Sequence, residues 1–418
     1  MLDIKMFREC PEIIKESEKK RFKDPSIVDR ILELDCEWRE KLKSLENFKC
    51  EKNRISREIG LLKRDGKDSK DLMEETSSMD GQIASLNSEI ESLIKRRDDL
   101  RYKVGNILHE SVPIAETDAG NATVREWGEP RKFDFEPKGH ADLVERFAEL
   151  ERAARISGAR TYFLKGDLAM LNLALINFAL KKLQDKGFTP MWTPFFMKTE
   201  MMRGAAELSD FEETLYRLEG EDALMIATSE QTLAALHAGE VLEENDLPLK
   251  YAGFSTCFRK EAGSHGKDTK GIFRIHQFEK VEQFVYCRPE ESWNIHEELI
   301  KNAEEIYREL ELPYRIVNIA SGDMNDNAAK KYDLEAWFPA QKTFRELVSA
   351  SNCTDFQARK LNVRMGKYGG EKQVLHTLNS TATATERTLS CILENYQQAD
   401  GSIIVPKVLR DFVGKDKI

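Results

Sequence analysis

The chain has 418 residues, of which 33% are charged and 40% hydrophobic, and its formal net charge is -10. At about 150 residues per domain this length predicts two or three domains, and the composition argues against an integral membrane protein and against a disordered chain. The negative net charge excludes a global attraction to nucleic acid, so any RNA contact must use local basic patches.

The chain carries no obvious targeting or cross-linking signal. Its first twenty residues alternate charged and apolar groups, unlike a signal peptide, and the longest apolar run, 168–180, is shorter than the ~20 residues that cross a bilayer. The seven cysteines are odd in number and widely spread, which argues against a disulfide framework and a zinc ribbon. We expect a cytoplasmic protein with no membrane partner, in which 168–180 is a buried helix.

Residues 31–107 carry a heptad pattern. Apolar residues recur at spacings of four and three from Met79 to Ile107, with one break at Arg97, and an earlier stretch, 31–62, keeps the same phase with Lys41 and Lys52 at seam positions. The polar stretch 63–71 separates them. This pattern predicts an antiparallel two-helix coiled coil whose arms each extend roughly 45 Å.

The charges on this predicted hairpin are uneven. Bases outnumber acids over residues 38–67 and 95–103, whereas 71–94 contain acids and no base. The basic stretches are able to meet phosphates, but a solvated coiled-coil face explains them as well and is favoured when the pattern is taken alone.

The pattern changes after Pro113. Glycines, a proline and scattered polar groups indicate a linker over 113–135, and from 136 helical stretches alternate with β-rich runs at 284–286, 314–319 and 402–406. We therefore predict an N-terminal domain over 1–112, a linker over 113–135 and an α+β catalytic domain over 136–418.

The stretch 255–286 is the most informative. Two β-compatible runs flank a glycine-containing loop rich in Lys and Arg, which fits a hairpin with a long basic loop. Arg259 and Arg274 fall on facing strands. Because guanidinium groups are planar forks that match phosphate oxygens, this pair could grip a polyphosphate at two points.

Five segments together resemble one family. FRKEAGSHGKDTKGIFRIHQFEKVE is similar to motif 2 of the seryl-tRNA synthetases, TPFFM (193–197) to motif 1, and TLNSTATATERTLSCILENYQQADG (377–401) to an archaeal or eukaryotic type of motif 3. IATSEQT (226–232) and FRELVSASNCTDFQARK (344–360) match two further segments in the family's order, and the N-terminal hairpin resembles its tRNA-binding arm.

The resemblance implies an ATP site and its catalytic groups. Arg259 would hold the α-phosphate and the serine carboxylate, and Arg387 the γ-phosphate end with Arg274 beside it. Glu261 would accept from the adenine amino group, Phe278 would stack on the base, and the backbone near Ile275 would close the pocket. The implied ATP-binding positions are Arg259, Lys260, Glu261, Arg274, Ile275, Phe278, Glu346, Leu347, Val348, Ser349 and Arg387.

The resemblance also implies Mg²⁺ bound through Glu346 and Ser349, and no zinc. Polyphosphate sites usually hold Mg²⁺ through one or two carboxylates plus the substrate. A regular strand would put two residues three apart on opposite faces, so the family match alone carries this assignment. Leu347 and Val348 depart from the family's commoner pattern and remove a hydroxyl at position 348.

Serine recognition requires hydrogen bonds to its hydroxyl, since an apolar pocket separates isosteres poorly. By resemblance the serine-binding positions are Thr228, Ser229, Glu230, Glu282, Asn379 and Thr381. The same residues in an anonymous chain would more often form a buried core network. Thr383 and Glu386 depart from the family pattern, and an inward Glu386 would weaken the grip of Arg387 on phosphate.

The family implies an antiparallel sheet flanked by helices, a homodimer built through motif 1, and a serine–tRNA ligase that uses ATP, L-serine and tRNA(Ser), with tRNA(Sec) as a further substrate. Two alternatives remain open. A synthetase-like paralogue that charges a carrier protein would lack the long arm, and an inactive RNA-binding dimer would have lost motif residues that this chain retains.

Overall fold

The computed structural model describes residues 1–207, 214–261, 270–367 and 370–418. These form two compact units, one made of Leu2–Lys19 with Lys23–Gly105, the other of Met1, Lys20–Phe22 and Asn106–Ile418. The basic loop residues 262–269 of the predicted hairpin lie outside the described residues.

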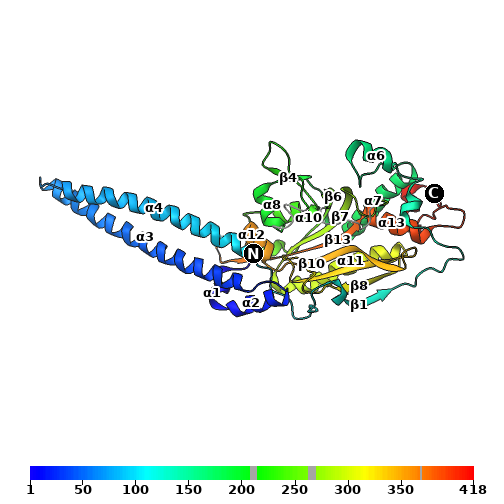
Figure 1. The fold of residues 1–418 in the computed structure, drawn as a ribbon, viewed down its shortest axis with the longest axis horizontal. Coiled ribbons are helices and arrows are strands. Elements are labelled where there is room, and N and C mark those ends of the chain that lie inside the picture. The colour runs from blue at the N-terminus through cyan, green and yellow to red at the C-terminus, as the bar shows by residue number, and fades with distance from the viewer. Residues whose placement is uncertain (208–213, 262–269, 368–369) are drawn as a thin grey trace. The chain divides into compact units, whose positions relative to one another are not determined.

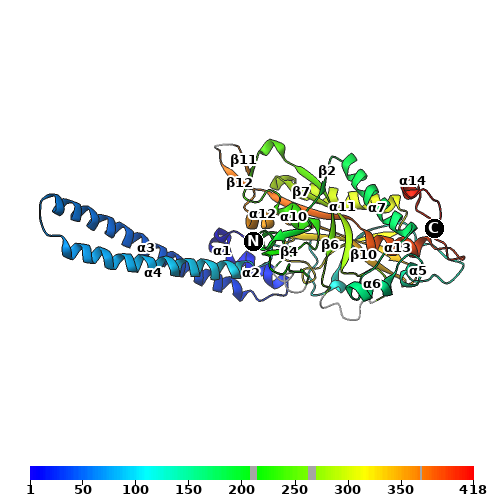
Figure 2. The ribbon, with the colours of Figure 1, turned by 90° about the horizontal axis from the view of Figure 1, so that it is seen from above.

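The first unit is helical. It contains α1 (Ile4–Glu9), most of α2 (Pro11–Lys20), α3 (Ser26–Arg64) and α4 (Lys70–Arg101). Helices α3 and α4 lie side by side along their length (Figures 1 and 2). With 39 and 32 residues they measure about 58 and 48 Å at 1.5 Å per residue, so the predicted antiparallel coiled-coil arm is confirmed.

The polar residues at the predicted seam find partners across the two helices. At the Arg97 break, the guanidinium lies 3.0 Å from the buried Asp35 carboxylate and over the ring of Trp38. Lys41 pairs with Glu89 at 2.8 Å. Lys52 pairs with Asp80. The seam therefore alternates apolar contacts with ion pairs.

The predicted continuation of the second helix to Ile107 is wrong. Helix α4 ends at Arg101, and the amides of Lys103 and Val104 bond to carbonyls only three residues back. The amide of Gly105 then donates to the Glu18 carboxylate at 3.0 Å. The helical ladder ends because these amides take other partners, although the apolar spacing continues in the sequence.

The second unit is built on an eight-stranded sheet in the order β1-β8-β9-β10-β13-β7-β6-β2, antiparallel except for the β2–β6 pair. Its strands are β1 (Ala122–Trp127), β2 (Thr189–Trp192), β6 (Leu249–Phe258), β7 (Gln277–Cys287), β8 (Tyr314–Asn318), β9 (Lys330–Phe338), β10 (Thr343–Asn352) and β13 (His376–Ala384). Two small sheets contain β3 (Phe196–Lys198), β4 (Ala223–Met225), β5 (Val241–Leu242), β11 (Arg364–Gly366) and β12 (Lys372–Val374).

Helices cover both faces of this sheet. They are α5 (His140–Val144), α6 (Leu150–Ser157), α7 (Asp167–Asp185), α8 (Thr199–Ala205), α10 (Ser229–Ala235), α11 (Ser292–Glu309), α12 (Phe356–Leu361), α13 (Thr385–Tyr396) and α14 (Arg410–Val413).

Strand β7 shows how the two faces differ. Its Val281 and Val285 join one hydrophobic cluster with α7, α11 and α13, whereas Phe284 and Tyr286 join another with α8, α10 and α12. Side chains alternate across a strand, so β7 separates two cores.

Several sequence predictions can be compared with these elements. The hairpin is confirmed, with Cys257 opposite Phe278 on β6 and β7, and 168–180 lies within α7 as a largely buried helix. The strand expected at 402–406 is wrong, since only isolated bridges at Ile403 and Ile404 form there. Within the segment interpreted as a linker, β1 pairs with β8, although its mostly exposed side chains gave no alternating pattern.

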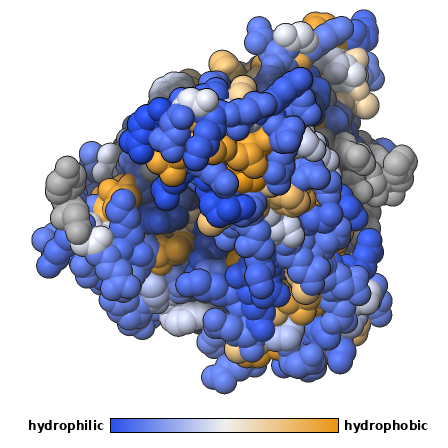
Figure 3. Space-filling view, turned by 90° about the vertical axis from the view of Figure 1, so that its left-hand side faces the viewer, coloured by the Kyte–Doolittle hydropathy of each residue, from blue (hydrophilic) through white to orange (hydrophobic). Residues whose placement is uncertain are grey.

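No helix among the described residues is long and apolar enough to span a membrane. In the space-filling view, hydrophilic side chains cover most of the face toward the viewer, and hydrophobic ones lie in small groups (Figure 3).

Candidate functional site

A cavity of about 370 Å³ lies in the second unit, at the β6–β7 hairpin and the start of α10. Its walls combine charged and small residues. They are Ala205, Ala206, Glu207, Thr214, Ala227, Thr228, Glu230, Gln231, Arg259, Glu261, Arg274, Asn325 and Asn327.

The two arginines predicted from the hairpin both line this cavity. Their expected placement on facing strands is wrong, since β6 ends at Phe258 and β7 begins at Gln277. The Arg259 amide donates to the His276 carbonyl across the hairpin at 2.8 Å, and its Nε donates to the Ala227 carbonyl at 3.3 Å. Arg274 Nη1 donates to Glu261 at 2.9 Å. Both arginines therefore border one shared space, as a two-point phosphate grip requires.

Glu261 occupies an unusual backbone position. Its φ of +51° lies in the left-handed region, which non-glycine residues rarely adopt. The chain turns there directly after the hairpin strand, and the Glu261 carboxylate meets Arg274. Backbone conformations of this kind are often found at binding sites.

Two other predicted nucleotide residues of the hairpin, Ile275 and Phe278, are not among the described residues that line the cavity. Ile275 and Phe278 are buried in a small cluster with Cys257, and burial raises the pKa of the Cys257 thiol to about 11. The Arg259 guanidinium lies 5.2 Å above the Phe278 ring. The Lys260 amide donates to the Thr214 carbonyl at 2.9 Å, which ties the hairpin to the cavity wall.

The start of α10 supplies part of the predicted serine set. Thr228 caps the helix by accepting from the Glu230 amide, and Glu230 accepts from Asn379 Nδ2 at 3.0 Å and from Gln357 Nε2 at 3.1 Å. Ser229 is fully buried and donates to the Gly253 carbonyl. The Ser229 hydroxyl therefore packs α10 against β6, whereas Thr228 and Glu230 face the cavity.

Glu282 lies next to these residues with a partner that sequence reasoning missed. The Lys280 ammonium lies 2.6 Å from the Glu282 carboxylate and donates to Thr228 Oγ1 at 3.2 Å, while Thr381 donates to Glu282 at 3.4 Å. Burial raises the pKa of Glu282, and the Lys280 charge opposes that effect. The spacing of two residues on a strand was the available signal for Lys280.

A β-bulge settles the geometry of the proposed metal pair. Opposite β9, Glu346 pairs with Glu335 and Val348 already pairs with Leu334, so β10 carries one extra residue at Leu347. That insertion places Glu346 and Ser349 on the same face, contrary to the regular-strand expectation. Leu347 and Val348 are buried in the core, so only their backbone groups are available to a nucleotide.

Arg387 lies directly beside Glu346. Its Nη1 is 3.3 Å from the Glu346 carboxylate and donates to the Glu346 carbonyl at 3.1 Å. Burial acts to raise the pKa of Glu346, but the charges of Arg387, Lys331 and Arg259 outweigh it and lower that pKa to about 2. Glu346 is therefore an ionised carboxylate with 44% of its side chain exposed, the kind of ligand a hard cation prefers.

Thr383 and Glu386, the two residues that depart from the family's motif 3, lie in different surroundings. A second bulge in β13, between Thr381 and Thr383, turns Thr383 away from Glu282 into a buried contact with Thr388. Glu386 is buried, with its carboxylate 3.8 Å from Arg387 Nε, which is the arrangement that would weaken the grip of Arg387 on phosphate. Burial raises the pKa of Glu386 to about 7.

Comparisons with known proteins identify the family. Residues 1–108 match the seryl-tRNA synthetase N-terminal domain, and residues 213–396 match the tRNA synthetase class II core domain (G, H, P, S and T). The chain is 55% identical to a serine–tRNA ligase of Methanosphaera stadtmanae, covering 98% of this chain and 97% of that protein, and 50% identical to one of Helianthus annuus, covering 99% and 97%.

Two solved structures are similar over their whole length. Seryl-tRNA synthetase from Pyrococcus horikoshii, complexed with ATP, has a TM-score of 0.94 at 46% identity, covering 100% of this chain and 99% of that one. The cytoplasmic serine–tRNA ligase of Naegleria fowleri, in complex with AMP, has a TM-score of 0.88 at 46% identity, covering 100% and 98%.

Proposed function

The chain belongs to the seryl-tRNA synthetase family, and from that membership we infer its activity: it is a serine–tRNA ligase that activates L-serine with ATP and transfers the serine to the 3′ end of tRNA(Ser). One structural observation connects this function with particular residues. Arg259, Arg274, Thr228 and Glu230 line a single cavity, with Glu282 hydrogen-bonded into the same network.

The reaction has two steps. A carboxylate oxygen of serine bonds to the α-phosphorus of ATP as pyrophosphate leaves, and a ribose hydroxyl of the tRNA then takes the acyl group as AMP leaves. We propose that Arg259 holds the α-phosphate and the serine carboxylate, while Arg387 and Arg274 hold the distal phosphates. Catalysis then comes from positioning and from stabilisation of charge on the phosphate oxygens.

The hairpin supports an adenine pocket. Glu261 would accept from the adenine amino group, with its carboxylate held by Arg274 at 2.9 Å. Phe278 would stack on the base, and the backbone at Ile275 would close the pocket from below.

Mg²⁺ is proposed at Glu346 and Ser349. The residues fit a hard cation because the bulge puts both oxygens on one face and Glu346 is ionised. When bound there, Mg²⁺ would neutralise part of the negative charge of the polyphosphate. The protein's own contribution is to hold the Glu346 carboxylate in place through Arg387.

Serine selection is proposed to rest on buried oxygens. Glu282, Thr228 and Thr381 would receive the ammonium and hydroxyl groups, with Glu230 and Asn379 forming the wall behind them. A side chain without a hydroxyl would leave these polar groups without that partner, which costs binding energy.

The proposal also includes the coiled-coil arm and a second copy of this chain. The basic stretches of α3 would contact tRNA(Ser), and tRNA(Sec) is proposed as a second substrate. A homodimer in the cytoplasm is proposed. Trp192, just before motif 1, and Phe196, within it, are 79% and 59% exposed, which supports a contact with a second copy there.

Pyrophosphate exchange tests the activity. The full-length protein is assayed with ATP and, in turn, serine, threonine, alanine and glycine. Exchange that depends on serine, at least about 100-fold above the other three, is expected. Equal exchange with several of them, or none with serine, would contradict the proposed function.

A further inference from the structure

Arg387 rests on an aromatic ring that belongs to none of the positions assigned above. Its guanidinium carbon lies 5.3 Å from the ring centroid of Phe273, and that of Arg345 lies 3.7 Å from the same centroid. We propose that Phe273 is a positioning residue of the ligase reaction, whose ring fixes the Arg387 guanidinium where the ATP phosphates meet it. This inference rests on the proposed function, because it assigns Arg387 to ATP.

The physical basis is the charge distribution of the ring. A guanidinium over an aromatic face is attracted by the ring quadrupole, and the attraction grows where water is excluded. Phe273 is buried, so the stack lies in such a place. An aliphatic side chain of similar size would fill the core but would leave Arg387 without this support.

Two acidic side chains lie close to the Arg387 guanidinium and could draw it away from phosphate. A contact that holds the guanidinium without competing for its hydrogen bonds would counter this effect. Glu346 lies 3.3 Å from its Nη1 and Glu386 lies 3.8 Å from its Nε. ATP phosphates must compete with both for the same guanidinium. The stack with Phe273 restricts Arg387 without occupying a hydrogen-bond donor, so it adds no further competitor to the phosphates.

The ring is itself held tightly. Phe273 packs edge-to-face on Phe338 at 5.5 Å and lies 5.9 Å from the His140 ring. Gly271, two residues before Phe273, has a φ of +76°. If Gly271 carried a Cβ atom, that atom would lie only 3.1 Å from the Cα of Ala141. The chain therefore passes close against the start of α5.

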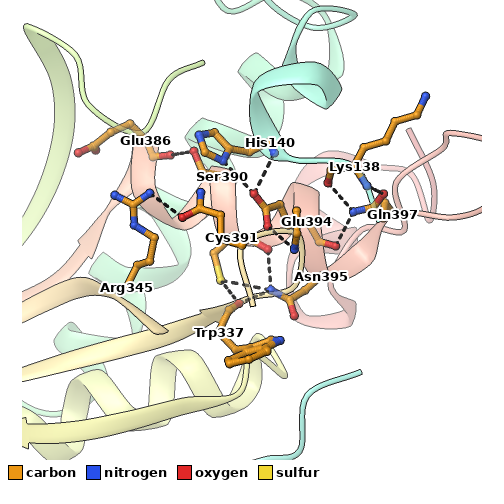
Figure 4. A network of polar contacts seen from close by, with 12 residues as sticks. Lys138, His140, Trp337, Arg345, Glu386, Ser390, Cys391, Glu394, Asn395 and Gln397 are labelled. Carbon is orange, nitrogen blue, oxygen red and sulfur yellow. Dashed lines mark hydrogen bonds and ion pairs between the residues drawn. The ribbon is translucent and has the colours of Figure 1, made fainter. Parts of the chain in front are cut away.

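Helix α13 connects His140 with Arg387. The His140 amide and Nδ1 both lie 2.9 Å from the Glu394 carboxylate, which also accepts from the Ala340 amide (Figure 4). Glu394 lies on the same helix as Arg387. Glu394, near the C-terminal end of α13, therefore holds His140, whose ring lies close to Phe273. Arg387, near the N-terminal end of the same helix, carries the guanidinium that Phe273 supports.

Four variants test the role. Phe273→Leu and Phe273→Met remove the ring, and Phe273→Tyr keeps it. Phe178→Leu is the matched control, because it makes the same change in the same hydrophobic cluster at a ring with no guanidinium over it among the described residues. Steady-state pyrophosphate exchange is measured with ATP and serine varied separately, together with thermal unfolding.

We expect both ring-free variants to raise the KM for ATP about tenfold, with the KM for serine changed less than about twofold. Phe273→Tyr and Phe178→Leu should keep both constants near those of the parent. In an Arg387→Ala background, Phe273→Leu should have almost no further effect on the KM for ATP, because the two residues act as one unit.

An unchanged KM for ATP, an equal rise for serine, or the same tenfold effect in the Arg387→Ala background would overturn the role. Absence of serine-dependent exchange in the parent protein would instead overturn the proposed function, so the two failures are distinguishable.

Discussion

The arm and the catalytic unit differ in how far their working residues lie apart in the chain. Along α3 and α4, each polar seam residue meets its partner at a point that the heptad register dictates, as Lys41 and Glu89 do. In the catalytic unit, Thr228, Glu282 and Thr381 come from three separate elements. A periodic element can therefore be removed as a block, whereas the cavity depends on individual side chains.

Removing the arm is the strongest way to test that separation. Replacing residues 42–88 with a short glycine-rich turn keeps the Lys41–Glu89 and Asp35–Arg97 pairs at the base, which should close a short hairpin. We expect tRNA charging to fall by about 1,000-fold or more, because the phosphate contacts of α3 are lost. Serine-dependent exchange should stay within about twofold of the parent, measured on the same preparation.

A full-length variant with Glu89→Ala serves as the control for local damage, since it loses the same ion pair but no basic residue of α3 and should lose little activity. Loss of exchange together with charging in a folded arm-deleted protein would contradict the separation.

Arg259 is the sharpest single-residue test inside the cavity. Arg259→Ala should lower the rate of exchange by about 100- to 1,000-fold, because the charge developing on the α-phosphate loses its donor. Arg315→Ala, which removes a partly exposed guanidinium paired with Glu335 on the sheet, is the matched control. Near-normal exchange by Arg259→Ala would remove this residue from the chemistry.

Lys280 tests whether the buried polar network selects serine. Lys280→Met leaves the buried Glu282 without its cation, so the pKa of Glu282 should rise further and the carboxylate should be protonated at higher pH. We expect the KM for serine to increase about tenfold near neutral pH and to fall as pH rises, because ionised Glu282 is the form that receives the serine ammonium.

The pH profile separates this role from a general loss of packing. Lys280→Arg keeps a cation and should show a flatter profile than Lys280→Met. A KM for serine that is raised equally at every pH would contradict the electrostatic role of Lys280.

Glu386 should affect stability, with little expected change in activity. Burial raises its pKa to about 7, whereas the unfolded chain has the ordinary glutamate pKa near 4.5. Between these two pH values the folded state holds a proton that the unfolded state releases. Stability must therefore fall as pH rises through that window. Glu386→Gln should exceed the parent in free energy of unfolding by roughly 2–3 kcal/mol at pH 8, and the difference should vanish near pH 4. Urea unfolding at several pH values measures it, and a difference independent of pH would contradict the raised pKa.

The sequence was sufficient where structure follows periodicity or a long motif. The heptads predicted α3 and α4, and the hairpin run predicted β6 and β7 with Arg259 and Arg274 facing one space. The limits of α4 could not be read in the same way. Apolar spacing continues to Ile107, while the helix ends where the Gly105 amide bonds to Glu18.

Two bulges explain most of what the sequence could not show. The extra residue at Leu347 puts Glu346 and Ser349 on one face, and the bulge before Thr383 turns that residue into the core. A period-two pattern has no signal for an inserted residue. Phe273 was missed for a related reason, since its contact with Arg387 joins elements far apart in the chain.

The most direct test is a crystal structure of the protein with a non-hydrolysable seryl-adenylate analogue. We predict that the Arg259 guanidinium lies about 3 Å from the phosphate position, and that the ammonium of the seryl group contacts Thr228 and Glu282. An analogue bound outside the cavity, or one whose seryl group faces away from Glu282, would contradict the account.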